Sequence, residues 1–343
     1  MKWVGWIAPV LLLVPVSCST GNASGSSDGG YSERNDGGSN TDASADGPSP
    51  AGWELTTSNT GLARIGLECA RLPLYAGPSK PPAGTIITEK RIATGLDLSA
   101  GNIVVERSCI RPTTIAKGLP VVTTTDNDAC RGDDCPAAPT MVVIRDSEID
   151  GTAVASATIA YSCAFLGIGT LERNDIHDVG SGICFFNTGD HLDAVARGNY
   201  VHHLRATGDP ASTGSHNEGI TIRDFETRLH PERRAIIRNN RFDSSSGNDT
   251  AAFFIQTYGG DIDQVLLQGN LLEGQGYQLV LEAGFNHVYG RALNAIDNRF
   301  SGTGYGIGYV ERKGLPYGWA LWQDNAMHDP AKPAHRGQLV ASP

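Results

Sequence analysis

The sequence predicts an all-β protein that folds as a right-handed parallel β-helix. Three observations support this prediction. A strand-like phrase returns along most of the chain, and no segment carries the apolar stripe of an amphipathic helix. The chain has 343 residues, 40% of them hydrophobic, so it can bury a sizeable core, and its 42 glycines and 18 prolines indicate many turns.

The returning phrase begins near residue 96 and consists of two to four strand residues, a short polar turn and another apolar residue. Its turn positions are Ser147, Asn174, Asn199, Asn240, Asn270, Asn298 and Asn325, at steps of 27, 25, 41, 30, 28 and 27 residues. A period in the twenties is typical of a solenoid, and the scaffold of a leucine-rich repeat is missing. Asparagine tolerates a left-handed backbone and can bond its counterpart one coil away. We therefore expect a structural column of asparagines.

The long step of 41 residues indicates an insertion after Val201. We expect two excursions from the regular coil, over residues 204–216 and 227–234, and residues 220–224 between them could form an additional coil. Loops on a rigid solenoid are where binding sites tend to be built, so this region is the candidate site.

The two ends of the chain lack the repeat. We expect residues 51–95 to lead into the first strands and cap the N-terminal end of the helix, and residues 318–343 to close the other end. Together with the coils they form one β-helix domain, residues 51–343.

The first 50 residues are typical of an export signal followed by a tether. Lys2 precedes a short apolar stretch that ends at Ser17-Cys18, a pattern that resembles a bacterial lipobox, with Pro15 where leucine is usual. We expect residues 1–17 to be a lipoprotein signal peptide, Cys18 to carry lipid, and residues 18–50 to be a flexible Gly/Ser/Asp linker. Ordinary signal cleavage without lipidation is the alternative.

This leader predicts an exported protein, lipid-anchored to the cell envelope at the outer membrane or cell surface, or secreted. No other apolar run is long enough for a transmembrane helix, so we expect membrane contact through the lipid anchor only.

Six cysteines follow the leader, and an even number in an exported chain suggests disulfides. Their pairing is open: the candidates are Cys69, Cys109, Cys130, Cys135, Cys163 and Cys184. Cys130 and Cys135 flank a four-residue loop that a local bridge could close. Cys163 and Cys184 lie close to one coil apart, so they could face each other across adjacent coils. A zinc site would need a second matching pair, which is missing.

The charge distribution bears on partners. The formal net charge is −10, which argues against duplex nucleic acid as the partner. Residues 197–241 reverse this trend with eight arginines, five acidic residues and four of the nine histidines. This surplus favours a positive groove for an anionic polysaccharide, although the arginines could simply decorate exposed coil turns. We expect a monomer.

The segment SHNEGITIRDF (215–225), with RNNRF (238–242), AAFFIQTYGG (251–260) and NAIDNRF (294–300), resembles the pectate-lyase-like superfamily of parallel β-helix proteins. The likeness covers roughly residues 85–330 and implies the fold. The likeness does not specify the activity, because this superfamily includes polysaccharide lyases, epimerases, hydrolases and non-enzymes. The signatures of polygalacturonases, calcium-dependent pectate lyases and mannuronan epimerases are absent. Where an HxDG-type coil is usual, this chain has His216-Asn217-Glu218-Gly219.

A polysaccharide lyase acting on a uronic-acid glycan is the function that we expect. β-Elimination needs a group that offsets the substrate carboxylate, a base and an acid. Arg223 suits the first role, and His216 or His203 could be the base. Glu218 could orient a histidine or bind a cation. No cofactor is certain and the metal ligands are unknown, but a divalent cation such as Ca²⁺ would be compatible.

Further substrate contacts are expected along one sheet. The polar residues that follow apolar strands could form a row: Arg223, Gln256, Glu282 and Glu311. Arg205 is another candidate contact, and Tyr258 and Tyr309 could stack on sugar rings, as could Tyr277, Tyr305, Tyr317 and Trp319. Two alternatives stay open: a glycoside hydrolase that pairs Glu218 with Asp209 or Asp249, and a non-catalytic glycan-binding or envelope structural protein.

Overall fold

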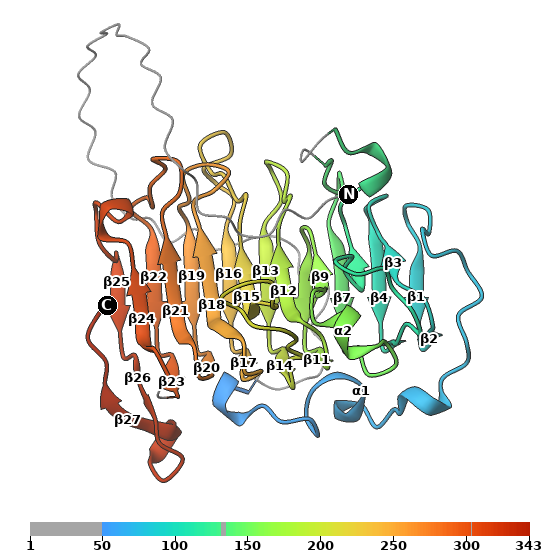
Figure 1. Ribbon diagram of the computed structural model, residues 1–343, viewed down its shortest axis with the longest axis horizontal. Helices are drawn as coiled ribbons and strands as arrows, with labels where there is room; N and C mark the ends of the chain where they lie inside the picture. The colour runs from blue at the N-terminus through green and yellow to red at the C-terminus, as the bar shows by residue number, and fades with distance from the viewer. Residues whose placement is uncertain (1–49, 132–134, 303) are drawn as a thin grey trace, which may run out of the picture. The chain divides into compact units, whose positions relative to one another are not determined.

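A computed structural model describes residues 50–131, 135–302 and 304–343. In this part of the chain, three parallel sheets run side by side along one stack of coils (Figure 1). The predicted parallel β-helix is confirmed. The predicted signal peptide, Cys18 and all but the last residue of the linker lie outside the described residues.

Sheets 1, 2 and 3 are named here after the strand with which each begins. Sheet 1 consists of β1 (Ile86–Thr88), β4 (Ile103–Glu106), β7 (Val142–Arg145), β10 (Thr170–Glu172), β13 (Ala194–Arg197), β16 (Ala235–Arg238), β19 (Val265–Gln268), β22 (Leu293–Ile296) and β25 (Leu321–Gln323). Sheet 2 consists of β2 (Arg91–Ile92), β5 (Cys109–Ile110), β8 (Glu148–Asp150), β11 (Asp175–His177), β14 (Tyr200–His202), β17 (Arg241–Asp243), β20 (Leu271–Glu273), β23 (Arg299–Ser301), β26 (Ala326–His328) and β27 (Arg336–Leu339). Sheet 3 consists of β3 (Leu96–Asp97), β6 (Val122–Thr123), β9 (Cys163–Leu166), β12 (Ser181–Phe185), β15 (Asn217–Ile222), β18 (Asp249–Gln256), β21 (Tyr277–Glu282) and β24 (Gly306–Val310).

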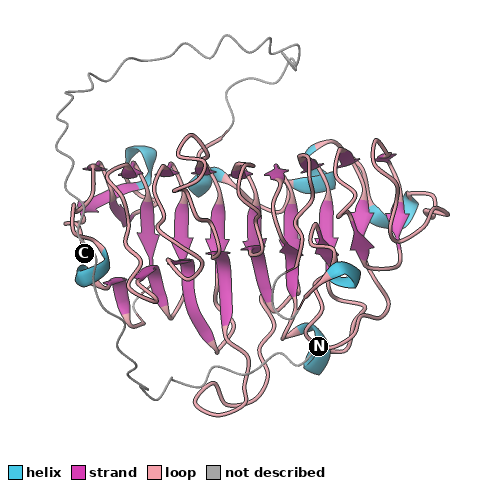
Figure 2. Cartoon of the chain, turned by 90° about the horizontal axis from the view of Figure 1, so that it is seen from above, coloured by secondary structure: helices cyan, strands magenta, loops and turns pink. Residues whose placement is uncertain are grey.

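Each coil visits sheets 1, 2 and 3 in turn, and Figure 2 shows the strands aligned side by side with loops extending beyond their ends. Helices are short: η1 (Gly52–Glu54), α1 (Gly61–Arg64), η2 (Cys69–Arg71), η3 (Asn127–Ala129), α2 (Ser156–Ile159), η4 (Arg312–Gly314) and η5 (Pro333–His335). Within the described ranges, none of them has the length and hydrophobicity needed to cross a membrane.

Parallel register stacks like residues on one another and so builds the core. In sheet 3 one inward column is formed by Phe165, Ile183, Ile220, Phe253 and Leu279, all of them buried. A strand turns alternate side chains to opposite faces, so their neighbours along each strand face outward. The alternating Val, Ile and Leu positions in the sequence thus specify the interior of the stack.

The predicted asparagine column exists at the turn between sheets 1 and 2. Each Asn side-chain oxygen accepts the backbone N–H of the residue one coil earlier, as in Asn174 N to Asn199 Oδ1 at 3.0 Å and Asn199 N to Asn240 Oδ1 at 3.0 Å. The ladder continues through Asn270 and Asn298 to Asn325 and starts with the smaller Ser108 and Ser147. All of its members are buried.

The reason given for asparagine at this turn was partly wrong. The ladder asparagines have negative φ, and the left-handed residue is the one just before each of them. Arg173, for example, has φ 56°, and Gly198 before Asn199 has φ 64°. Asparagine is therefore required for its side-chain hydrogen bonds, while the preceding position supplies the tight turn.

The insertion after Val201 contains no extra coil. Residues 220–222 belong to β15, the sheet 3 strand of the same coil as β13 and β14. The added length lies in two loops, residues 203–216 before β15 and residues 223–234 after it.

The N-terminal segment does not cap the stack as expected. Residues 51–72, called the strap below, run along the side of the stack, from the coil of Gly269 back to that of Cys109 (Figure 1). Gly52 N–H donates to Gly269 O at 2.8 Å, and Gly61 N–H donates to Arg173 O at 2.8 Å. Since the repeat carries no signal for this course, the sequence did not predict it.

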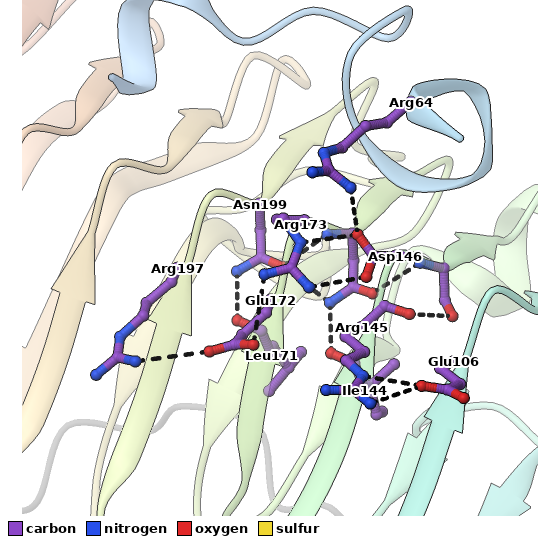
Figure 3. Close-up of polar contacts among 12 residues, drawn as sticks. Arg64, Glu106, Ile144, Arg145, Asp146, Leu171, Glu172, Arg173, Arg197 and Asn199 are labelled. Atoms are coloured by element: carbon purple, nitrogen blue, oxygen red, sulfur yellow. Dashed lines mark hydrogen bonds and ion pairs between the residues drawn. The ribbon is translucent and has the colours of Figure 1, made fainter. Parts of the chain in front are cut away.

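Side chains also fix the strap. Arg64 reaches Asp146 at 3.1 Å, and Arg173 binds the same carboxylate at 2.8 Å beside the ladder (Figure 3). Near the other end the ring of Trp53 lies 4.1 Å from the guanidinium of Arg299.

The C-terminal end closes as predicted. Strand β27 pairs antiparallel with β26, and Trp322 Nε1 donates to Val340 O at 2.8 Å.

Three disulfides are present, Cys69–Cys109, Cys130–Cys135 and Cys163–Cys184. The local Cys130–Cys135 bridge and the bridge across adjacent coils are both confirmed, the latter with its Cα atoms 6.1 Å apart.

Candidate functional site

The outer face of sheet 3 carries most of the predicted site residues. Its outward column passes from Cys184 through Thr221, Phe254 and Val280 to Tyr309. Phe254 and Val280 pack with Ala251 outside the main core. This face therefore has an apolar surface of its own, with the two long loops around β15 at its sides.

Glu218 lies on this face next to an irregularity in β15. The register with β18 shifts between Asn217 and Glu218, and such bulges re-aim side chains next to functional sites. Ser181 Oγ donates to Glu218 Oε2 at 3.0 Å. Burial raises the pKa of Glu218, while the hydrogen bond from Ser181 and the charges of His216 and Arg223 act in the opposite direction. Glu218 thus combines a tendency to stay protonated with two basic neighbours.

Asn217 explains how the HNEG turn is held. Its side chain is fully buried, and Nδ2 donates to Gly180 O at 2.6 Å and to Arg205 O at 3.2 Å. Asn217 therefore anchors the loop before β15, whereas His216 next to it is exposed.

Arg223 follows β15 and is fixed from three sides. Its Nε donates to Gln256 Oε1 at 2.7 Å. Its guanidinium lies 4.7 Å from the ring of Phe186 and 5.0 Å from that of Tyr258. Burial lowers the pKa of Arg223. This cation is therefore held next to two aromatic rings.

The predicted polar row exists. Arg223, Gln256, Glu282 and Glu311 occupy equivalent positions at the ends of successive strands. Gln256 Nε2 donates to Glu282, and Glu311 accepts the N–H of Ala283 at 2.7 Å. We expected Gln256 to contact a substrate. It is fully buried and instead links Arg223 to Glu282.

Tyrosines extend this face toward the C-terminal coils. Tyr277 occupies the register column of Glu218, two strands away, or about 10 Å at the usual strand spacing. Its ring lies 5.5 Å from Tyr305 and 5.8 Å from Tyr309, which are 72% and 44% exposed. Exposed aromatic faces of this kind can stack on sugar rings.

A second aromatic pair borders Arg223. Tyr258 is exposed and contacts Phe285 with ring centroids 4.7 Å apart. Phe285 was not predicted, since it lies in a loop without strand pattern. Of the other expected platforms, Tyr317 is exposed and stacks on Arg291, whereas Trp319 packs on Trp322.

His203 and Arg205 belong to a different part of the surface. They follow β14 of sheet 2 and line a cavity of about 500 Å³ together with Asp178, Leu204 and Ser245–Gly247. Arg205 forms an ion pair with Asp178, and His203 Nδ1 lies 3.0 Å from His202 Nδ1. The structure thus separates these two predicted residues, by their contacts, from the group around Glu218.

The positive surplus of residues 197–241 is largely compensated. Four of its arginines form ion pairs with carboxylates: Arg197 with Glu172, Arg205 with Asp178, Arg228 with Glu226 and Arg241 with Glu273. Two of the partners lie earlier in the chain, beyond the counted segment. Half of the arginines in this segment are therefore engaged by carboxylates, and Arg223 is the arginine that borders this face.

The two other carboxylates proposed for a hydrolase, Asp249 and Asp209, accept backbone N–H groups. Asp249 accepts the backbone N–H groups of Gln275 and Gly276, each at 2.5 Å. Asp209 accepts the N–H of Ala211 at 2.9 Å in an exposed loop. Asp249 therefore bonds backbone groups of the next coil, whereas Asp209 bonds within its own loop.

Arg233 was missed by sequence reasoning because arginine is normally exposed. It is 1% exposed and donates to the carbonyl oxygens of Gly189 at 2.8 Å, Leu192 at 3.0 Å and Glu226 at 3.1 Å. Burial lowers its pKa to about 10. Arg233 ties together the loops that follow β12 and β15, and these loops border the site.

One acidic cluster in this part of the chain already has a cation. Asp97, Asp126 and Asp128 approach one another, and the ammonium of Lys80 lies 3.3, 2.9 and 3.5 Å from their carboxylates. We therefore assign no calcium site there.

Compared with known protein families, curated proteins and solved structures, the chain matches none. Its function must be argued from the chemistry of the site itself.

Proposed function

We propose that the outer face of sheet 3 binds a polysaccharide and that the protein is a polysaccharide lyase for uronic-acid glycans, a distant member of the pectate-lyase-like superfamily. One observation carries this proposal. Glu218, a carboxyl group with a raised pKa, lies on β15 with His216 just before the strand and Arg223 just after it, beside exposed tyrosines.

β-Elimination can be assigned to these three residues. The base removes the proton from C5 of the uronic acid, the electron pair forms the C4–C5 double bond, and the C4–oxygen bond breaks. His216 is exposed, and an imidazole is the side chain best suited to take up a proton near neutral pH, so it is assigned as the base. Glu218, whose pKa is raised by burial, suits the acid that gives a proton to the departing oxygen.

Arg223 would offset the substrate carboxylate. Its guanidinium is fixed by Gln256, Phe186 and Tyr258, so it needs no reorganisation when charge develops on the substrate. A planar guanidinium also suits a carboxylate better than an ammonium does. The tyrosines around Tyr277 would bind further sugar units along the sheet.

The test incubates purified protein with a panel of uronic-acid polymers and follows ultraviolet absorbance together with reducing ends. A lyase gives both signals, because each cleavage creates an unsaturated sugar and a reducing end. Reducing ends without absorbance would identify a hydrolase and contradict the proposal.

Variants then locate the site. Arg223→Ala and Glu218→Gln should each lower the rate at least about 10²-fold, as the loss of a transition-state donor does. Arg238→Ala is the matched control, because Arg238 also bonds a glutamine, Gln268, at 2.9 Å but lies on sheet 1. Activity unchanged in Arg223→Ala would overturn the site assignment.

A non-catalytic glycan-binding protein is the second candidate. It is favoured by the saturated surroundings of Arg223, which is bonded to Gln256 and covered by two rings. Glycan retention in a pull-down, with neither absorbance nor reducing ends, would establish this alternative.

We further propose export and lipid anchoring through Cys18. Three disulfides are usual in oxidising compartments outside the cytosol, which supports export. Cys18→Ala should move the protein from the membrane fraction to the soluble fraction after cell fractionation. Persistence of the variant in the membrane fraction would exclude this anchor.

A further inference from the structure

Sheet 2 carries a cluster of ionisable groups that the proposed function does not use. Glu148 and Asp150 lie two residues apart on β8, on the same side of the strand, and the buried Ile149 between them faces the core. His177 of β11 is the register partner of Asp150. The three side chains therefore share the outer face of sheet 2.

Their ligand atoms converge. His177 Nε2 lies 3.3 Å from Glu148 Oε1, and His177 Nδ1 lies 4.0 Å from Asp150 Oδ1. One ligand atom from each residue can be chosen so that all three lie within 4.8 Å of one another. Since the side chains stand on two adjacent hydrogen-bonded strands, this arrangement is preformed.

The imidazole of His177 is also oriented by a carboxylate on its other nitrogen. Asp178 Oδ2 lies 2.7 Å from His177 Nδ1, and Asp178 is held by Arg205. A carboxylate on the far nitrogen of a histidine is the usual outer partner of a metal ligand, because it fixes the tautomer and turns the other nitrogen toward the ion. Here that other nitrogen faces Glu148.

The charge around the cluster also favours a bound cation. Three carboxylates lie within 4.0 Å of His177, namely Glu148, Asp150 and Asp178, and a fourth, Asp175, contacts His202, whose ring stacks on that of His177. Two guanidinium groups, of Arg111 and Arg205, compensate them, which leaves an excess of two negative charges when the histidines are neutral. A divalent ion would balance this excess.

We propose that Glu148, Asp150 and His177 bind one divalent transition metal ion on the outer face of sheet 2. One imidazole and two carboxylates form a borderline-to-hard ligand set that suits Zn²⁺ or Mn²⁺. The cavity lined by Asp178, His203 and Arg205 adjoins the cluster. This site is independent of the glycan site on sheet 3.

The competing occupant is a proton. Although burial acts against it, hydrogen bonds with Glu148 and Asp178 raise the pKa of His177 to about 9. Without a metal, the imidazolium serves as an internal counter-ion for the same carboxylates. Direct metal titration separates the two states.

The experiment uses exported full-length protein without a histidine tag, treated with a chelator and dialysed. Zn²⁺ and Mn²⁺ are titrated by calorimetry, and the bound metal is counted by elemental analysis. We expect one ion per chain. Glu148→Gln and His177→Gln should each weaken binding at least about 10-fold, and Asp178→Asn about 10- to 100-fold.

His335→Gln is the control, because it removes an imidazole from another histidine pair, His328 Nε2 to His335 Nδ1 at 3.0 Å. Circular dichroism checks that each variant is folded, and the Co²⁺ absorption spectrum provides a second readout, expected to change in Glu148→Gln and His177→Gln but not in His335→Gln. Wild-type binding weaker than about 100 µM, or binding that persists in both ligand variants, would overturn the proposal.

Discussion

Two columns of polar side chains run along the stack, and they follow opposite rules. The ladder between sheets 1 and 2 repeats one solution: from Asn174 to Asn325 every member is a buried asparagine with the same bonds to its neighbours. The row at the end of sheet 3 changes at every coil, through Arg223, Gln256, Glu282 and Glu311.

The difference follows from what each column contacts. The ladder asparagines bond equivalent groups one coil away, so one residue type satisfies every position. The row lies on the outward side of the stack, so successive coils can carry different residue types at this position. In this solenoid, sameness along a column indicates scaffold and variation indicates a candidate site.

The largest loss of stability is expected from a substitution that interrupts the asparagine ladder. Asn240 Oδ1 accepts from Asn199 N and Nδ2, and its own Nδ2 donates to Ala196 O and Asn270 Oδ1. Asn240→Ala leaves several buried groups without partners, each worth about 1–3 kcal/mol, so unfolding in urea should show a loss of about 4 kcal/mol. Asn294→Ala, outside the ladder on β22, is the control with little effect. A loss below about 1 kcal/mol in Asn240→Ala would contradict the structural role.

The next largest effect is expected from removing the Cys163–Cys184 bridge of sheet 3. Cys163 and Cys184 are 21 residues apart, and removing this bridge with a double alanine variant should cost about 3 kcal/mol through the entropy of the unfolded chain. Cys130 and Cys135 are 5 apart, and the same change there should cost about 2 kcal/mol. Denaturant unfolding of both variants measures the order, and the reverse order would show that the loop argument fails here.

A smaller effect on stability is expected within the row. Arg223→Ala removes the bond to Gln256 and the contacts with Phe186 and Tyr258, so it should cost about 1–2 kcal/mol. Thermal unfolding next to Arg238→Ala, which should cost less than about 1 kcal/mol, measures the difference. A loss as large as that of Asn240→Ala would remove the distinction between scaffold and site.

The smallest effect concerns pH. Burial raises the pKa of Glu218 above its ordinary value of 4.5, so the folded protein holds this proton more tightly than the unfolded chain does. Its contribution to stability is therefore greatest below the ordinary pKa and decreases as the pH rises through the raised one. Glu218→Gln should remove this decrease when melting temperatures of both proteins are compared from acidic to neutral pH. Parallel curves would show that Glu218 is not perturbed.

The sequence predicted what repeats. Recurrence located the ladder, the polar row and the coil-to-coil bridge of Cys163 and Cys184. The strap escaped prediction, because its partners are backbone groups such as Gly269 O and Arg173 O, which leave no side-chain pattern. His203 was grouped with Glu218 by closeness in sequence, but a corner of the coil lies between their contacts.

The strap has a consequence for how the protein folds and opens. In a solenoid each coil contacts only its neighbours, so the terminal coils can fray independently of the rest. Here Gly52 bonds the coil of Gly269, and a disulfide joins Cys69 to Cys109 near the other end. Coils far apart in the stack are thereby coupled, and we expect them to lose hydrogen-exchange protection together.

The course of the strap along the stack also determines when the strap can dock during folding. The strap is synthesised before the coils, but the surface to which it binds is complete only after the coils of Asn240 and Gly269 have been made. Contacts of such long sequence separation form slowly, so docking of the strap should be a late folding step, after most of the chain has been made.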